Sequence, residues 1–314
     1  LVLRGDESDI DLRSGGAAIG AASEGAIPGV VRYVGDGAGG GAVYDGLAER
    51  DGPAGTPIVS YTHLAIDSGG LAEEFRLGGD TTVEGDLTLT SGTLIPDDSG
   101  GVGPFTLSVG GNWDSSAAGG IFDGSAGGTV VFNGTAGAQT VAADTAGGER
   151  FASLTAANSS GAPTVQLTTP ITVAGDLTIA TGTLDANDGS AHQINLGGSW
   201  TNSGGTFAPG GNSVVLDGTG SQIVSADTFA TVSIESSVTW PDQVTFSGDI
   251  VADSIITSTN AVITAQGAVN VGTLAANFAG SDVQIEGNLT VTTGMSAGAD
   301  AFTLELSGDA NSIA

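Results

Sequence analysis

Apolar residues follow a period-two pattern over short stretches, which end in glycine and polar residues. The clearest stretch has apolar or small residues at alternate positions, at Ile171, Val173, Gly175, Leu177 and Ile179. This is the period of a β-strand whose two faces differ, and the spacing of an amphipathic helix is nearly absent. The sequence therefore predicts an all-β chain of many short strands.

The strand pattern is repeated on two scales. Residues 83–94 return as residues 173–184, which is 90 residues later, and both copies hold the motif Gly-Asp-Leu followed by Gly-Thr-Leu. A shorter repeat lies inside the long one, and within each group its marker glycines recur roughly every twenty residues. The three groups are Gly85, Gly111 and Gly134, then Gly175, Gly198 and Gly218, then Gly248, Gly267, Gly287 and Gly308.

Two architectures are compatible with short strands separated by glycine-rich turns. One is a parallel β-helix, or β-solenoid, in which each coil has roughly twenty residues. The alternative is a series of tandem β-sandwich domains, because 90 residues is near the size of one such domain. The inner repeat favours the solenoid, since the strands of one sandwich need not resemble each other.

The first 55 residues differ from the rest of the chain. They hold four of the six arginines and two loose glycine- and alanine-rich stretches. We interpret residues 1–55 as an irregular N-terminal cap or docking arm and residues 56–314 as the repetitive solenoid, because terminal units of repeat proteins are atypical. The residues predicted to form an assembly arm are Leu1, Val2, Leu3, Ile10 and Leu12.

The repeats resemble those of a known class of protein. Residues 171–184, with the following Gly-Gly-Ser-Trp-Thr-Asn-Ser-Gly-Gly-Thr-Phe at 197–207, look like the β-strand repeats of large bacterial surface proteins. These are autotransporter passengers and filamentous-haemagglutinin-like adhesins. The resemblance covers about residues 75–310. It implies a right-handed parallel β-helix and an extracellular or cell-surface location, and it transfers no catalytic residue.

Charge narrows the possible partners. The chain has 35 acidic residues against 6 arginines and no lysine, a formal net charge of −29. Nucleic acids and anionic membranes are excluded as partners, because binding them needs a basic surface. No apolar run reaches the roughly 18 residues of a membrane span. Because the chain begins with Leu1, we expect a processed product or a piece of a longer polypeptide.

Catalytic chemistry is poorly represented, and we predict that the chain is not an enzyme. There is no cysteine, and the two histidines, His63 and His192, have no catalytic or metal-binding spacing. A polysaccharide-degrading β-helix enzyme is the remaining enzymatic alternative. Such a hydrolase needs two converging carboxylates, whereas the acidic loops here recur in each long repeat, as turn residues do.

Ca²⁺ is the one cofactor for which the sequence offers candidate ligands, and we otherwise expect none. These weak candidates are Asp97, Asp98, Asp185, Asn187 and Asp188, in equivalent loops after the Gly-Thr-Leu motif. Their spacing does not match the helix-loop-helix calcium site, and Asp and Asn are ordinary turn formers.

Two further sets of residues bear on a surface location. Glycosylation sequons begin at Asn133, Asn158 and Asn288. Trp113 and Trp200 hold equivalent repeat positions, so we expect them to stack inside the solenoid and not to bind carbohydrate.

The functional prediction is an extracellular structural protein, a self-assembling filament, stalk or surface-layer subunit whose main partner is another copy of itself. The repeat without a unique site favours this interpretation, and the open ends of a solenoid need capping or pairing. The alternative is an adhesin or carbohydrate-binding module that binds surface glycans through one lateral face.

Overall fold

The structure is a computed structural model of the whole chain. It describes residues 2–4, 27–34, 43–47, 59–70, 72–97, 101, 103–117, 119–144, 146–159, 164–218, 222–223, 227–234, 238–240, 243–248, 250–257, 262–276, 282–297 and 303–306. The chain divides into two compact units, Leu1–Thr172 and Val173–Ala314. Each unit is described by itself.

The first unit consists of short strands and one turn of 3₁₀ helix at Gly124–Ala126. Its strands are β1 (Val2–Arg4), β2 (Ile27–Val34), β3 (Val43–Leu47), β4 (Val59–Asp67), β5 (Glu74–Leu77), β6 (Thr81–Val83), β7 (Leu87–Ile95), β8 (Thr106–Val109), β9 (Trp113–Asp114), β10 (Gly120–Phe122), β11 (Thr129–Phe132), β12 (Ala138–Ala142), β13 (Ser153–Ala157) and β14 (Thr164–Leu167). Strand β15 (Ile171–Val173) begins in the first unit and ends in the second.

The second unit has only strands among its described elements. They are β16 (Leu177–Thr181), β17 (Thr183–Asp185), β18 (Ile194–Leu196), β19 (Trp200–Asn202), β20 (Thr206–Ala208), β21 (Ser213–Leu216), β22 (Gln222–Ile223), β23 (Thr228–Phe229), β24 (Thr231–Ile234), β25 (Val238–Trp240), β26 (Gln243–Phe246), β27 (Ile250–Thr257), β28 (Val262–Ala265), β29 (Val269–Ala276), β30 (Asp282–Ile285), β31 (Leu289–Ala297) and β32 (Thr303–Leu306).

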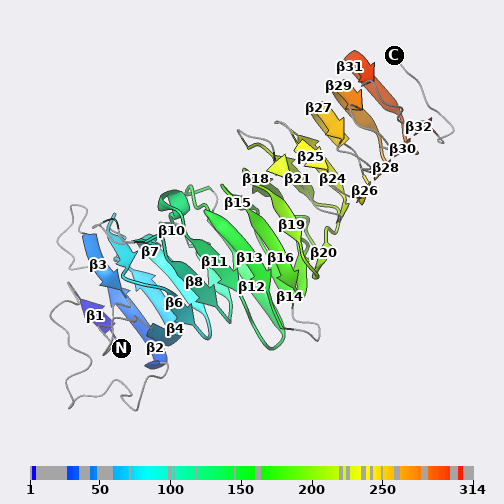
Figure 1. Cartoon of the computed structure of the whole chain (residues 1–314). Helices are drawn as coiled ribbons and strands as arrows, with labels where there is room; N and C mark the ends of the chain where they lie inside the picture. The colour runs from blue at the N-terminus through cyan, green and yellow to red at the C-terminus, as the bar shows by residue number, and fades with distance from the viewer. Residues whose placement is uncertain are drawn as a thin grey trace. The chain divides into compact units, whose positions relative to one another are not determined.

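Strands of successive coils pair in parallel, which makes the chain a β-solenoid. The first unit has three sheets. One contains β6, β8, β11 and β13, a second contains β9, β12 and β14, and a third contains β3, β5 and β10. The long strands β4 and β7 each take part in two of these sheets. Figure 1 shows β8, β11 and β13 side by side. The prediction of a solenoid is confirmed. The tandem-sandwich alternative is wrong, because sandwiches are built from antiparallel sheets.

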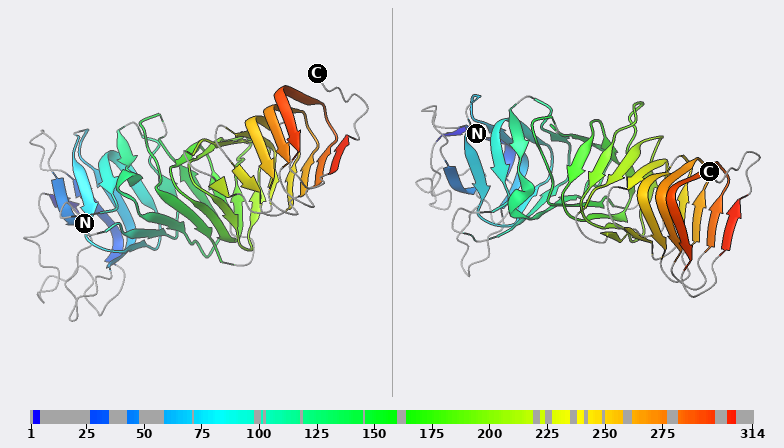
Figure 2. Two further views of the ribbon diagram at one scale, coloured as in Figure 1. Left: turned by 45° about the horizontal axis from the view of Figure 1, so that its top comes forward. Right: turned by 90° about the horizontal axis from the view of Figure 1, so that it is seen from above.

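The second unit repeats this arrangement with shorter coils. One of its sheets runs β18, β21, β24, β27, β29 and β31, and another runs β23, β26, β28, β30 and β32. The stack of β27, β29 and β31 is visible from two directions in Figure 2, in orange to red.

The contacts between neighbouring coils give the coil lengths directly. In the first unit, the hydrogen bond that joins Asn112 to Asp86 one coil earlier spans 26 residues. In the second unit, the bond that joins Ser247 to the Phe229 carbonyl one coil earlier spans 18 residues. The coils therefore have close to the length predicted from the glycine repeat. The first coil step of the second unit still spans 23 residues, and the later coils are shorter.

The core of each unit is the lumen of its coils. Strand residues alternate between buried and partly exposed, as in β11 and β21, so each strand sends every second side chain inward. Trp113 packs on Phe122, Phe132 and Phe151 with ring centroids 5.2 to 6.0 Å apart. In the second unit Trp200 packs on Phe207 and Phe229 at 4.7 and 5.0 Å. Rings at these distances and edge-to-face angles attract beyond their area burial.

The described part of residues 1–55 continues the parallel ladders. Strand β1 pairs with β2, with Leu3 opposite Tyr33, and β2 pairs with β4, with Val31 opposite Leu64. Of the predicted assembly arm, Val2 and Leu3 therefore lie in a strand of their own solenoid. Leu1, Ile10 and Leu12 lie outside the described residues.

Candidate functional site

The repeated Gly-Asp-Leu motif forms the corner where one coil is bonded to the next. The Asp86 carboxylate accepts the backbone N–H of Asn112, one coil ahead, at 2.8 Å. Asp176 does the same for the backbone N–H of Ser199 at 2.7 Å. Asn112 continues the series, because its side-chain oxygen accepts the N–H of Thr140 at 2.9 Å. The aspartate of the motif therefore forms a joint between coils, by which we mean a side chain that accepts a backbone N–H of the next coil. Side chains cap backbone donors in turns in the same way.

The marker glycine that faces this motif from the next coil is required by the close approach of the two coils. A Cβ on Gly111 would lie 2.4 Å from the carbonyl carbon of Gly85, and one on Gly198 would lie 2.2 Å from that of Gly175. The backbones are bonded there, with the Gly111 N–H donating to Gly85 O at 2.9 Å. Stacking within the chain therefore demands these marker glycines, because any side chain would push the coils apart.

A buried carboxyl lies beside the aromatic cluster of the first unit. Glu149 is only 2% exposed. Its Oε1 accepts the indole N–H of Trp113 at 3.0 Å, and its Oε2 accepts the Ser115 hydroxyl and the backbone N–H of Asp144, the latter at 2.7 Å. Burial raises the pKa of Glu149 to about 7, although the three hydrogen bonds lower it, with Ser115 the largest of them.

The second unit has a counterpart built from a different position. Asp227 Oδ2 accepts the indole N–H of Trp200 and an amide N–H of Asn202, each at 3.0 Å. Burial raises its pKa. In sequence, Asp227 aligns with Asp144 and not with Glu149. From Asp144 to Phe151 is seven residues and from Asp227 to Phe229 is two, so five extra residues bring Glu149 to the indole.

Sequence reasoning missed Glu149, because residues 139–145 align with 222–228 and the alignment resumes only at Phe151 and Phe229. The five-residue difference in spacing is the signal that could have found it. The indole N–H of a buried tryptophan needs a hydrogen-bond acceptor, and an acidic residue in a nearby insertion is a candidate for that acceptor.

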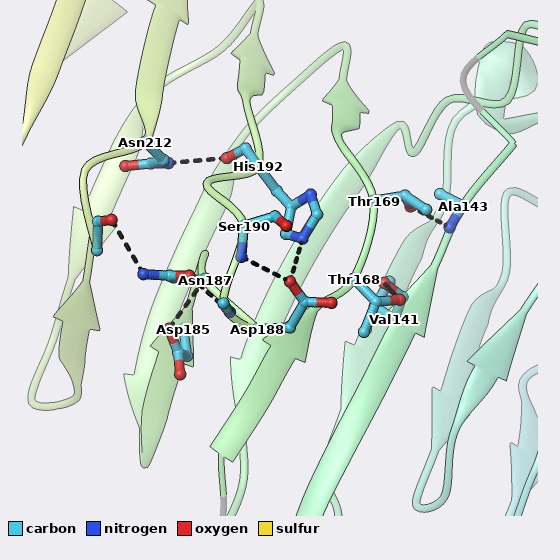
Figure 3. A network of polar contacts seen from close by, with 12 residues as sticks. Val141, Ala143, Thr168, Thr169, Asp185, Asn187, Asp188, Ser190, His192 and Asn212 are labelled. Carbon is cyan, nitrogen blue, oxygen red and sulfur yellow. Dashed lines mark hydrogen bonds and ion pairs between the residues drawn. The ribbon is translucent and has the colours of Figure 1, made fainter.

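The loop at 185–192 is held by its own hydrogen bonds (Figure 3). Asp185 accepts the Asn187 N–H at 3.0 Å and Asn187 accepts the Gly189 N–H at 2.8 Å. Asp188 Oδ1 accepts the Ser190 N–H at 3.1 Å and lies 2.9 Å from His192 Nε2. The hydrogen bond with His192, followed by that from Ser190, lowers the pKa of Asp188. Sequence reasoning did not pair Asp188 with His192, although their four-residue spacing in one loop could have indicated the contact.

Three of the weak Ca²⁺ candidates, Asp185, Asn187 and Asp188, thus have oxygens engaged in turn hydrogen bonds. In the equivalent loop of the first unit, the Asp97 carboxylate lies 2.6 Å from the guanidinium of Arg76, and Asp98 lies outside the described residues. Within the part of the chain that the structure describes, no three His, Asp or Glu side chains converge as metal ligands.

The two repeat tryptophans and the sequon asparagines differ in their exposure to solvent. Trp113 and Trp200 are fully buried, which confirms their predicted position inside the solenoid and removes them as carbohydrate-stacking residues. Asn158 is also fully buried, so its sequon is closed to a glycan in the folded chain. Asn133 is partly exposed and Asn288 exposed, at corners between strands.

Comparison of the chain with protein-family models, with curated proteins and with solved structures finds no match. Among the described residues, no helix is long and apolar enough to cross a membrane.

Proposed function

We propose that this chain is an extracellular structural protein, a β-solenoid subunit of a filament, stalk or surface layer, similar to autotransporter passengers and filamentous-haemagglutinin-like proteins. One observation carries the proposal. The acid that the sequence repeats most faithfully, at Asp86 and Asp176, is bonded to the backbone of the following coil. What the chain repeats is therefore a joint between coils, and such a repeat serves extension and stacking.

The acidic composition supports an extracellular role for such a scaffold. A net charge of −29 keeps single chains apart in dilute solution and is screened at high ionic strength. Association of copies should then increase as salt is added, because screening removes the repulsion between them.

Electron microscopy of the purified chain over a range of salt concentrations tests the proposal. Filaments or sheets are expected, and monodisperse single particles at every concentration and salt level would contradict it. Two variants locate the assembly arm. Deletion of residues 1–25 removes β1 together with the rest of the arm, whereas Ile10→Asp with Leu12→Asp leaves β1 in place. Loss of polymers in both variants, with an unchanged β-sheet circular dichroism spectrum, is the expected result.

A further inference from the structure

Residues 146–149 of the first unit end in a buried acid, Glu149, whose surroundings accommodate two protonation states. We propose that this segment is a proton-operated latch, closed on Trp113 while Glu149 is protonated and opened when Glu149 ionises. All four residues of this segment are described, and Asp144 takes part through the hydrogen bond that its N–H donates to Glu149. The latch does not depend on the proposed function.

Ser115 allows the neutral acid to be fully hydrogen-bonded. Its hydroxyl contacts Glu149 Oε2 and also lies 3.2 Å from the carbonyl oxygen of Ala142. When Glu149 carries a proton, Oε2–H donates to Ser115 Oγ, and the serine hydroxyl rotates to donate to Ala142 O. The indole N–H of Trp113 and the backbone N–H of Asp144 still find acceptor oxygens on the carboxyl group.

The ionised acid is hydrogen-bonded but has no compensating charge. The charged groups on the elements packed around it are Asp114 after Trp113, Asp123 after β10, Asp144 before the segment and Arg150 directly after it; β11, β12, β13 and β14 carry none. The negative charge of Asp144 disfavours ionisation of Glu149. Within the described residues no cation forms an ion pair with Glu149, and a buried unpaired charge is strongly unfavourable.

The segment is built to move without disturbing the sheets. Ala146, Gly147 and Gly148 are exposed, and Gly148 adopts a φ of +92° with nothing within 4 Å of its Cβ position. The Gly147 and Glu149 N–H groups donate to Asp144 O in the same turn, so the Glu149 carboxyl group makes the contacts that close the segment on the lumen.

The chain on either side of the segment is held by hydrogen bonds that do not involve Glu149. The Ala143 N–H donates to the Thr169 hydroxyl at 2.7 Å, and the Arg150 N–H donates to Phe122 O at 3.3 Å. Releasing Glu149 would therefore uncover the indole of Trp113 while β9 and β12 stay paired.

The direction of the pH effect follows from the two states. The pKa of Glu149 is about 7 when the segment is closed and near its ordinary value of 4.5 when it is open. A raised acid pKa stabilises the closed form fully below pH 4.5, and this stability is lost as the pH rises to 7. The opening constant is therefore expected to rise about 300-fold between these values and then to level off.

Asp227 provides the internal contrast. Its carboxylate accepts an indole N–H, an amide N–H and the backbone N–H of Thr228, and none of these donors can reverse to accept a proton. A protonated Asp227 therefore lacks the hydroxyl relay that Ser115 supplies to Glu149. The ability to hold either state belongs to the inserted segment of the first unit.

Hydrogen exchange of the Asp144 amide tests the latch, because this N–H donates directly to Glu149. Exchange of the intact chain is followed by mass spectrometry from about pH 4 to pH 8.5 and corrected for the intrinsic pH dependence of exchange. The wild type should show the rise and the plateau near pH 7. Asp114→Asn, which removes a neighbouring charge without touching Glu149, should behave as the wild type does.

Two variants then isolate the acid. Glu149→Gln should give an opening constant that is independent of pH, even if its mismatched amide raises the constant uniformly. Asp144→Asn should shift the midpoint to lower pH, because it removes the repulsive charge while its side-chain oxygen still accepts the Gly147 N–H. A flat wild-type profile, or a rise that persists in Glu149→Gln, would overturn the proposal.

Discussion

Replacing the corner glycine Gly198 with alanine should destabilise the second unit by about 2–4 kcal/mol. The added Cβ would lie 2.2 Å from the Gly175 carbonyl carbon, whereas ordinary contacts begin at 3.4 Å. The coils must therefore move apart by about 1 Å, which a close-packed interior does not absorb without loss. That movement stretches the Gly198 N–H bond to Gly175 O, now 3.0 Å, and the Ser199 N–H bond to Asp176, now 2.7 Å. Lost hydrogen bonds of about 1 kcal/mol each and overpacking of about 1–3 kcal/mol exceed the roughly 0.4–1 kcal/mol gained through the unfolded chain.

Gly189→Ala is the matched control in the same unit. Gly189 has a φ of +113° and nothing within 4 Å of its Cβ position, so alanine there meets only backbone strain, about 1–3 kcal/mol. Urea denaturation followed by circular dichroism gives the two midpoints, and hydrogen exchange over residues 194–202 locates the damage. If Gly198→Ala speeds hydrogen exchange over residues 194–202 no more than Gly189→Ala does, close coil approach is not the reason for the glycine.

Three further predictions concern the joints and the core. Asp176→Ala should cost about 1 kcal/mol, because the freed Ser199 N–H lies near solvent, and should speed exchange of that amide more than of its neighbours. Phe151→Ala should cost about 3–5 kcal/mol in thermal or urea unfolding, since the ring is fully buried against Trp113. Trp200→Phe should raise the pKa of Asp227 further, because it removes a hydrogen bond that lowers it, and carboxyl-carbon NMR titration measures this shift.

The fold was predictable because its information is local and repeated. Alternation in a stretch such as residues 171–179 identifies strands, and the inner glycine period distinguishes coils from sandwiches. The position of Trp113 and Trp200 in the lumen followed from their equivalence in the repeats. Each of these features is present in more than one copy, so a departure from the pattern in one copy does not alter the interpretation.

The buried acids were not predictable in the same way. Glu149 accepts the indole N–H of Trp113 as Asp227 accepts that of Trp200, yet the two acids do not align in sequence. An acceptor only has to lie close to the indole N–H in space, and residues at different sequence positions can do so. The reason for the corner glycines was also hidden. Gly111 looks like a turn residue in sequence, whereas its role is to let two backbones meet.

The corner joints also bear on how such a chain can change in length during evolution. In each unit a coil is bonded to its neighbour through the same Gly-Asp geometry, and Asn112 is joined in this way to the coil before it and to the coil after it. Duplication or deletion of one whole coil then joins surfaces that already match. Insertion or deletion of a single residue within a strand instead exchanges the inward-facing and outward-facing side chains. Natural variants of this chain are therefore expected to differ by whole coils, in steps of roughly twenty residues.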